Sequence, residues 1–162
     1  MNEKEFILLI DEHKSLIFKV CNLYCAAAER PDLQQEILLQ LWQSMDKYDG
    51  RVKISTWIYK IALNTAVSHY RKTSKKRKNR AILSASILIN DSDYDFEKDQ
   101  NIKRLYSYIQ ELKVMDRALI LLYLDQYKYE EIANIIGISR TNVATKLSRI
   151  KNHLRTRFKD VK

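Results

Sequence analysis

The sequence contains few residues that interrupt helices. Its 162 residues include two glycines, Gly50 and Gly137, and one proline, Pro31. It also has no long apolar run, because the longest unbroken one covers only residues 118–124, whereas a transmembrane helix needs about 20 apolar residues. The N-terminal residues MNEKEF do not supply the basic segment and apolar segment of a secretion signal. These absences predict an all-α protein of the cytoplasm, without membrane insertion.

Residues that could hold a metal ion are few and poorly spaced. Cys21 and Cys25 lie one helical turn apart, but no histidine follows them at the spacing of zinc ligands, so we expect reduced thiols. The aspartates at 91, 93 and 95 match the opening of an EF-hand calcium loop. Phe96 and Ile102, however, occupy the positions where that loop needs Gly and Glu. No metal site is predicted.

A catalytic constellation is missing as well. The histidines at positions 13, 69 and 153 are scattered, and none has a nucleophile or a carboxylate pair beside it in sequence. The two glycines are 87 positions apart and cannot form a Gly-rich phosphate loop. We therefore predict that the protein is not an enzyme and binds no cofactor.

Positive charge is abundant and is concentrated in two segments. Residues 71–80 and 139–162 carry +7 each, and the rest of the chain sums to −5, which gives the formal net charge of +9. Two separate cationic segments predict two contacts with a polyanion, because counterion release on binding offsets the cost of grouping like charges. Residues 81–100, with a charge of −4, have the composition of an acidic linker.

Residues 129–151, YEEIANIIGISRTNVATKLSRIK, have the pattern of a helix-turn-helix. A short helix ends in a turn at Gly137, and Ser139 is a good N-cap for the next helix. Apolar residues recur in that helix at helical spacing: Val143, Leu147, Ile150 and Leu154. Its opposite face is polar and consists of Thr141, Asn142, Thr145, Ser148, Arg149 and Asn152, flanked by Arg140 and Lys146. Such a helix enters the major groove of DNA, where these side-chain types contact base edges and phosphates.

The alternative for this segment is a helical hairpin with a solvated outer face, which is the commoner fate of an amphipathic pair. A solvated surface usually mixes both signs of charge. The outer face here is short of acids, which favours DNA binding.

Three helices are predicted before the linker. The first covers residues 6–24. The second follows Pro31, with Asp32 as its N-cap and Gln35 three residues later, and its inner stripe consists of Leu33, Ile37, Leu38, Leu41, Trp42 and Met45. A loop at residues 47–56 leads to a third helix at 57–72. Helices at 102–112 and 116–127 precede the helix-turn-helix. The predicted domains are residues 1–78 and 101–162, joined by a flexible acidic linker at 79–100.

Two long segments carry motifs of a known family. In residues 32–72 an acidic DLQQE helix and an LW pair precede the helix TWIYKIALN, which runs into basic residues. Residues 112–155 contain YEEIA, GIS and LSR elements. These segments resemble regions 2 and 4 of RNA polymerase sigma factors. The stretch between them is too short for the extra helical domain of larger sigma factors, which indicates the extracytoplasmic-function group. Lys113 and Lys128 replace a Pro and a Ser that are usual in the family, so the helix after Lys128 needs another cap.

The resemblance implies a transcription initiation factor that binds core RNA polymerase and directs it to promoters. The outer face of the second helix would dock on the clamp helices of the β′ subunit through Asp32, Gln35, Glu36, Leu39 and Gln40. The loop and the third helix would recognise and open the −10 element through Tyr48, Gly50, Arg51, Lys53, Ser55, Thr56, Trp57, Tyr59 and Asn64. Trp57 could instead pack in the core, as large aromatic residues usually do.

The resemblance also assigns the two basic segments. Backbone phosphates would be held by Lys72, Lys75, Lys76 and Arg77, and the −35 element would be read by Arg140, Thr141, Asn142, Thr145, Lys146 and Arg149. The β flap of the polymerase and an anti-sigma factor are the further partners implied. Two other functions remain open. A stand-alone helix-turn-helix regulator would leave residues 32–72 without a role, and a helical interaction adaptor would leave both basic segments without one.

Overall fold

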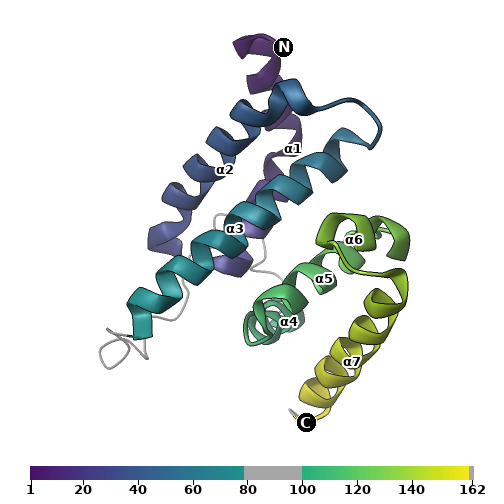
Figure 1. Ribbon diagram of the computed structural model, residues 1–162. Helices are drawn as coiled ribbons and strands as arrows, with labels where there is room; N and C mark the ends of the chain where they lie inside the picture. The colour runs from purple at the N-terminus through teal and green to yellow at the C-terminus, as the bar shows by residue number, and fades with distance from the viewer. Residues whose placement is uncertain (79–99, 161–162) are drawn as a thin grey trace. The chain divides into compact units, whose positions relative to one another are not determined.

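A computed structural model describes residues 1–78 and 100–160 of the chain, without the side chains of residues 75–78. Every regular element in these ranges is helical, and none of them is a strand. The chain divides into two compact units, and the described residues form three α-helices in the first and four in the second (Figure 1). The α-helices described are α1 (Glu3–Tyr24), α2 (Arg30–Ser44), α3 (Ile54–Lys78), α4 (Gln100–Gln110), α5 (Val114–Leu124), α6 (Tyr129–Ile136) and α7 (Arg140–Lys159). The predicted all-α fold with two helical domains is confirmed. The predicted linker lies outside the described residues, apart from Gln100.

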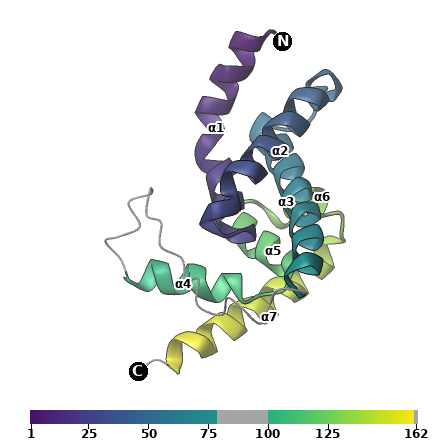
Figure 2. The same ribbon diagram turned by 90° about the vertical axis from the view of Figure 1, so that its left-hand side faces the viewer.

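The first unit is a three-helix bundle in which α1 packs against both α2 and α3 (Figure 2). A capping box starts α1, since Asn2 and Glu5 each accept, through the side chain, a hydrogen bond from the other's backbone N–H at 2.9 Å. The N-terminal half of α1 leaves Ile7 and Leu8 57% and 65% exposed. Its C-terminal half supplies the buried residues: Leu16, Ile17, Val20, Cys21, Leu23 and Tyr24. The core of this unit therefore lies under the C-terminal half of α1.

Two predictions about α2 are wrong. The helix begins at Arg30, and Pro31 occupies its first turn, where an amide N–H would have no partner within the helix. Asp32 is therefore inside that turn and does not cap the helix. Trp42, predicted for the inner stripe, is 45% exposed. At about 100° per residue it lies about 140° around the helix from the buried Ile37.

The loop before α3 is shorter than predicted. A short 3-10 turn, η2 (Met45–Lys47), follows α2, and α3 starts at Ile54. Ser55 and Thr56, predicted as loop residues, belong instead to the first turn of α3, and the loop comprises residues 48–53. α3 continues to Lys78, so the basic segment is helical up to that residue.

In the second unit α4 and α5 begin two residues before their predicted starts. The turn between them is held by Arg117, which is buried. Its Nε donates to the carbonyl of Leu112 at 2.9 Å, and its backbone N–H donates to the carbonyl of Lys113 at 3.1 Å. α5 is the central helix of the unit, with a run of buried apolar residues: Ala118, Leu119, Ile120, Leu121 and Leu122. Within residues 1–78 and 100–160, no helix has both the length and the apolar character needed to cross a membrane.

Candidate nucleic-acid and polymerase interfaces

A rigid turn joins α6 to α7. Gly137 ends α6 with a φ of 82°, in the left-handed region that glycine adopts without strain. The backbone N–H groups of Gly137 and Ile138 both donate to the carbonyl of Ala133, at 2.8 and 3.2 Å. Ser139 caps α7 as predicted, because its hydroxyl accepts from the N–H of Asn142 at 3.1 Å. The backbone hydrogen bonds thus fix the point where α7 begins.

No side chain caps the first-turn amides at the start of α6, because the ammonium group of Lys128 cannot accept a hydrogen bond. The carboxylate of Glu131 accepts from the backbone N–H of Lys128 at 2.8 Å, which is one half of a capping box and does not replace the cap that a serine at position 128 would provide. Arg140 and Glu130 face each other across the turn with 3.9 Å between Nε and Oε1. Both side chains are exposed, so this pair adds little stability.

α7 separates an apolar side from a polar side. The predicted stripe is buried in full, at 0 to 7% exposure: Val143, Leu147, Ile150 and Leu154. The predicted groove-facing residues are all exposed, namely Arg140, Thr141, Asn142, Thr145, Ser148, Arg149 and Asn152, while Lys146 is half-buried. The Thr145 hydroxyl donates to the carbonyl of Thr141 at 3.0 Å, which leaves its lone pairs able to accept. One side of α7 therefore presents polar groups to solvent along its N-terminal turns.

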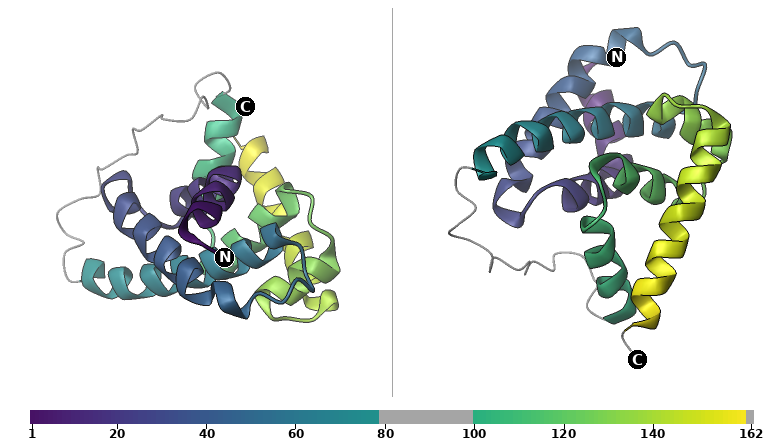
Figure 3. Two further views of the ribbon diagram at one scale, coloured as in Figure 1. Left: turned by 90° about the horizontal axis from the view of Figure 1, so that it is seen from above. Right: turned by 60° about the horizontal axis from the view of Figure 1, so that its bottom comes forward.

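The C-terminal end of α7 is attached to α4. Both nitrogen–oxygen distances from Arg157 Nη2 to the Glu111 carboxylate are 2.9 Å. The same guanidinium lies 4.8 Å from the ring centre of Tyr108, and Phe158 packs edge-on against that ring at 5.2 Å. Figure 3 shows this end of α7 beside α4. α7 is consequently fixed at both ends, by the Ser139 turn and by this cluster.

α3 carries a mixed aromatic and polar face near its start. Trp57 is half-buried and Asn64 is exposed, and seven residues of helix place them on the same side. Tyr59, predicted as a −10 contact, is only 1% exposed and Thr56 only 8%. The prediction for Tyr59 is wrong, because a residue two positions from Trp57 lies about 160° away around the helix. Lys60, which the sequence analysis missed, is exposed and shares the Trp57 side at spacing i+3.

The loop before α3 is ordered by its own side chains. The Tyr48 hydroxyl donates to the carbonyl of Val52 at 2.7 Å, and the Tyr48 ring packs on Trp57 with 5.3 Å between ring centres. The Asp49 carboxylate accepts from the N–H of Arg51 and pairs with its Nε, both at 3.1 Å. Gly50 has a φ of 76°, and no atom lies within 4 Å of the position of a Cβ. Further exposed residues of the loop are Arg51, Val52 and Lys53. The loop thus presents its polar groups in one preferred arrangement.

Beyond Asn64, α3 becomes increasingly basic. Arg71 and Lys72 are exposed on the helix. Lys75, Lys76 and Arg77 belong to α3 by their backbone, and their side chains are outside the described residues.

The outer face of α2 contains the residues predicted for polymerase docking. Asp32, Gln35, Glu36, Leu39 and Gln40 are all exposed, and Leu39 is exposed to 52%. Trp42 lies on the same side as Gln35, seven residues earlier, and the Phe6 ring packs edge-on against it at 5.0 Å. Leu39 and Trp42 together form an exposed apolar patch at spacing i, i+3. This spacing was visible in the sequence, but Trp42 was grouped with the inner apolar stripe of the helix.

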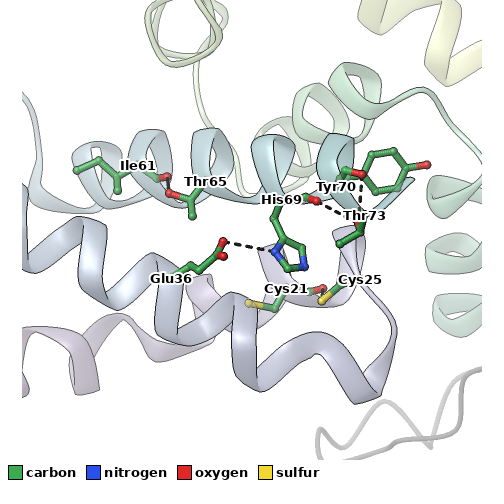
Figure 4. A network of polar contacts seen from close by, with 8 residues as sticks. All are labelled: Cys21, Cys25, Glu36, Ile61, Thr65, His69, Tyr70 and Thr73. Atoms are coloured by element: carbon green, nitrogen blue, oxygen red, sulfur yellow. Dashed lines mark hydrogen bonds and ion pairs between the residues drawn. The ribbon is translucent and has the colours of Figure 1, made fainter. Parts of the chain in front are cut away.

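A polar cluster lies behind this face. His69 of α3 approaches Glu36 of α2 with 3.4 Å between Nδ1 and Oε2, and Figure 4 shows its ring between Glu36 and two cysteines, Cys21 of α1 and Cys25 directly after this helix. The thiol of Cys25 donates to the carbonyl of Cys21 at 3.3 Å. Both cysteines are buried thiols outside any disulfide of the described residues, and burial raises the pKa of Cys21 to about 12. Among the described residues no group of three or more potential ligands is arranged to hold a metal ion.

Comparison with known proteins agrees with this arrangement. The family model of Sigma-70 region 2 matches residues 9–76, which include α2, the loop and most of α3. The model of Sigma-70 region 4 matches residues 102–154, which include the helix-turn-helix. Together the two models cover most of the chain, one in each unit.

Similar proteins extend over nearly the full chain. The ECF RNA polymerase sigma factor SigW of Bacillus subtilis is 24% identical, with 99% of this chain and 92% of SigW covered. The ECF RNA polymerase sigma-E factor of Haemophilus influenzae is 22% identical, with 97% and 89% covered. Among solved structures, the sigma factor RpoE of Bartonella quintana, in complex with the anti-sigma factor NepR, has a TM-score of 0.75 at 22% identity, with 96% of each chain covered. CnrH, in complex with the cytosolic domain of CnrY, has a TM-score of 0.69 at 19% identity, with 98% of this chain and 90% of CnrH covered. The chain belongs to the sigma-70 family, in its extracytoplasmic-function group, and is a transcription initiation factor.

Proposed function

We propose that the first unit docks on core RNA polymerase and handles the −10 element, and that the second unit reads the −35 element. The observation that carries this proposal is the polar side of α7. Its groove-facing residues are exposed over a fully buried stripe, on a helix whose start is fixed by Ser139. A helix held in this way can place side chains at defined positions in a major groove.

The −35 contacts are assigned to the N-terminal turns of α7. Asn142 and Thr145 can hydrogen-bond base edges, while Arg140, Thr141, Lys146 and Arg149 can contact either bases or phosphates. All of these except Lys146 are exposed.

The −10 contacts are assigned to the loop and one side of α3. A base that leaves the duplex needs an aromatic surface and hydrogen bonds to its edge. Trp57 and Asn64 share one side of α3 and supply both. Tyr48, Gly50, Arg51 and Lys53 supply the loop contacts. Ser55 is half-buried at the start of α3 and stays in this set, whereas Tyr59 and Thr56 leave it because they are buried.

Phosphates beside the opened region are assigned to the basic side chains of α3. Lys60 joins the four residues proposed from the sequence, because it is exposed between Trp57 and Asn64 on the same side of the helix. The four are Lys72, Lys75, Lys76 and Arg77. Contacts of this kind position the protein without reading sequence.

Polymerase docking is assigned to the outer face of α2. Asp32, Gln35, Glu36 and Gln40 offer polar contacts around the exposed Leu39, and Trp42 extends the apolar part of the surface. Apolar groups surrounded by polar ones are typical of protein interfaces. The β′ clamp helices are the proposed partner, and the β flap is the proposed partner of the second unit.

Regulation by an anti-sigma factor is part of the proposal. Two similar sigma factors have been solved in complex with NepR and with the cytosolic domain of CnrY, which supports a partner of that kind for this chain. We also propose that the protein resides in the cytoplasm and has no enzymatic activity, because members of the family act as non-catalytic polymerase subunits. A stand-alone regulator is disfavoured because it gives the α2 face no role.

Run-off transcription with core polymerase and promoters from the same organism tests the proposal. Transcripts should require both the chain and core enzyme, and replacement of Leu39 and Trp42 by Ala should abolish co-purification with core. Leu8→Ala is the matched control, because Leu8 is also an exposed apolar residue, at 65%, on another helix. Tight sequence-specific duplex binding by the chain alone, with no transcription alongside core enzyme, would support a stand-alone regulator instead.

A further inference from the structure

A cavity in the second unit lies between the start of α5 and the middle of α7. Its volume is about 500 Å³. Residues from two segments at least 30 positions apart in sequence line it: Lys113, Val114, Met115, Asp116, Lys146, Arg149 and Ile150. Two of these, Lys146 and Arg149, are among the residues proposed to contact the −35 element, so the cavity adjoins the DNA-binding side of α7.

The lining of this cavity is positively charged. Lys113, Lys146 and Arg149 contribute three cations, and Asp116 contributes one acid. None of the three cations forms an ion pair with another described residue, whereas Arg157 of the same unit is paired with Glu111. A concave surface with unpaired cations attracts an anion and holds it more strongly than an open surface does.

The backbone at the start of α5 adds to this charge. Lys113 is the residue before the helix and makes no side-chain cap, and an ammonium group has no lone pair with which to accept from the first-turn amides. The positive end of the helix dipole therefore lies at the cavity. Arg117 donates hydrogen bonds to the carbonyls of Leu112 and Lys113. These bonds fix the backbone of Lys113, from which its side chain extends.

The geometry of α7 indicates which anion occupies the cavity. Asn142 and Arg149 are seven residues apart and share one side of the helix. When that side lies in a major groove, the phosphate backbones that border the groove run along the flanks of α7, and the cavity lies on one of these flanks, where Lys146 and Arg149 line it. We propose that the cavity seats a backbone phosphate of the −35 duplex, with Lys113 and Lys146 as its ligands. Lys113 is then a positioning residue that sets how far α7 enters the groove.

This inference rests on the proposed function and is tested on the holoenzyme. Binding of fluorescent duplexes is measured between 50 and 200 mM salt, with an active promoter and with the same duplex after its −35 element is scrambled. Each phosphate contact contributes about 0.9 to the slope of log affinity against log salt. Lys113→Gln and Lys146→Gln should each lower the slope on both duplexes, and because the two lysines hold one phosphate, the double variant should lower it by about that amount in total. Across this salt range the wild type then loses about 3.5-fold more affinity than the double variant.

Lys103→Gln is the matched control. Lys103 is an exposed lysine of α4 that does not line the cavity, so its loss removes the same charge and should leave the slope unchanged. Equal slopes for the wild type and Lys113→Gln, in a holoenzyme that transcribes normally, would overturn the inference and leave the proposed function intact. A wild-type holoenzyme that transcribes from no promoter would overturn the proposed function itself.

A free anion is the competing occupant. Calorimetric titration with inorganic phosphate distinguishes it from DNA. If phosphate saturates the full chain, Lys113→Gln abolishes that binding and the duplex slopes stay unchanged, then the cavity serves a free phosphate and the inference is wrong. If phosphate binds only weakly while the slopes fall as expected, the DNA backbone is the ligand.

Discussion

Replacing Asn142 by Ala should separate DNA recognition from folding. The Asn142 side chain is exposed, and its backbone N–H, which Ala keeps, donates to the Ser139 hydroxyl. Ala is also the better helix former, by up to about 0.7 kcal/mol. The melting temperature of the variant should therefore equal or slightly exceed that of the wild type.

The expected loss of DNA affinity is much larger. A side-chain contact with a base edge contributes about 1–3 kcal/mol of discrimination, which corresponds to about 5- to 150-fold in affinity. The loss should appear at one −35 position, because other bases at that position no longer differ from the preferred one. Ser139→Ala is the converse variant. It removes the cap at a cost of about 1 kcal/mol and should lower the melting temperature of the second unit by about 4–8 °C, with sequence preference retained.

Holoenzyme binding to a promoter set with each −35 position changed in turn measures both effects. Lys159→Ala is the reference for a non-specific charge, because Lys159 is exposed at the far end of α7. The assignment of α7 as the reading helix fails if Asn142→Ala and Lys159→Ala reduce affinity by the same factor on every promoter variant.

Four further predictions concern other parts of the chain. Gly137→Ala meets no atom within 4 Å, so only its φ of 82° opposes the change; we expect a loss of about 1–2 kcal/mol, seen as lower thermal stability. Trp57→Ala should reduce promoter opening, monitored with permanganate, more than it reduces closed-complex binding. Transplanting residues 48–56 into a related sigma factor should give that factor the −10 preference of this protein. Equal losses in both steps, or an unchanged preference, would contradict these assignments. Because burial raises the pKa of Cys21 to about 12 from 9.0, the unfolded state ionises first, and stability should fall as pH rises above about 9. Cys21→Ser should remove that part of the pH dependence, and an identical profile would refute it.

The sequence predicted the helix-turn-helix in detail because several independent signals agree there. Four apolar residues recur at helical spacing, and the Ser139 hydroxyl can accept a backbone hydrogen bond as an N-cap. Gly137 adopts the left-handed φ of the turn without strain. Each of these signals is local, so no tertiary contact is needed to interpret it.

Trp42 and Tyr59 were misassigned for a common reason. Trp42 was grouped with the apolar stripe of its helix and Tyr59 with the residues that would hold a base, although their angles around the helix give the opposite positions. The buried stripe of α2 gives the angle of Trp42 around its helix. The spacing of two residues from Trp57 gives the angle of Tyr59 around α3.

The cavity beside Lys113 was beyond sequence reasoning. It depends on the packing of α5 against α7, and nothing local to residue 113 indicates that Lys146 and Arg149 will lie next to it. The start of α3 could not be predicted from the sequence either. No strong capping residue precedes Ile54, and the helix begins where the Trp57 backbone N–H donates to the carbonyl of Lys53.

The length of α7 limits how much DNA this protein can read. Twenty residues of helix extend about 30 Å, whereas the major groove is about 12 Å wide. A straight rod of that length leaves the groove before it ends, so the turns that contain Asn142, Thr145 and Arg149 can touch bases while the last turns extend beyond the duplex. The attachment of Arg157 to Glu111 is at this distal end, away from the bases. The contacts that fix the orientation of α7 are therefore spatially separate from the contacts that read sequence. Changes in one set can leave the other set unaffected.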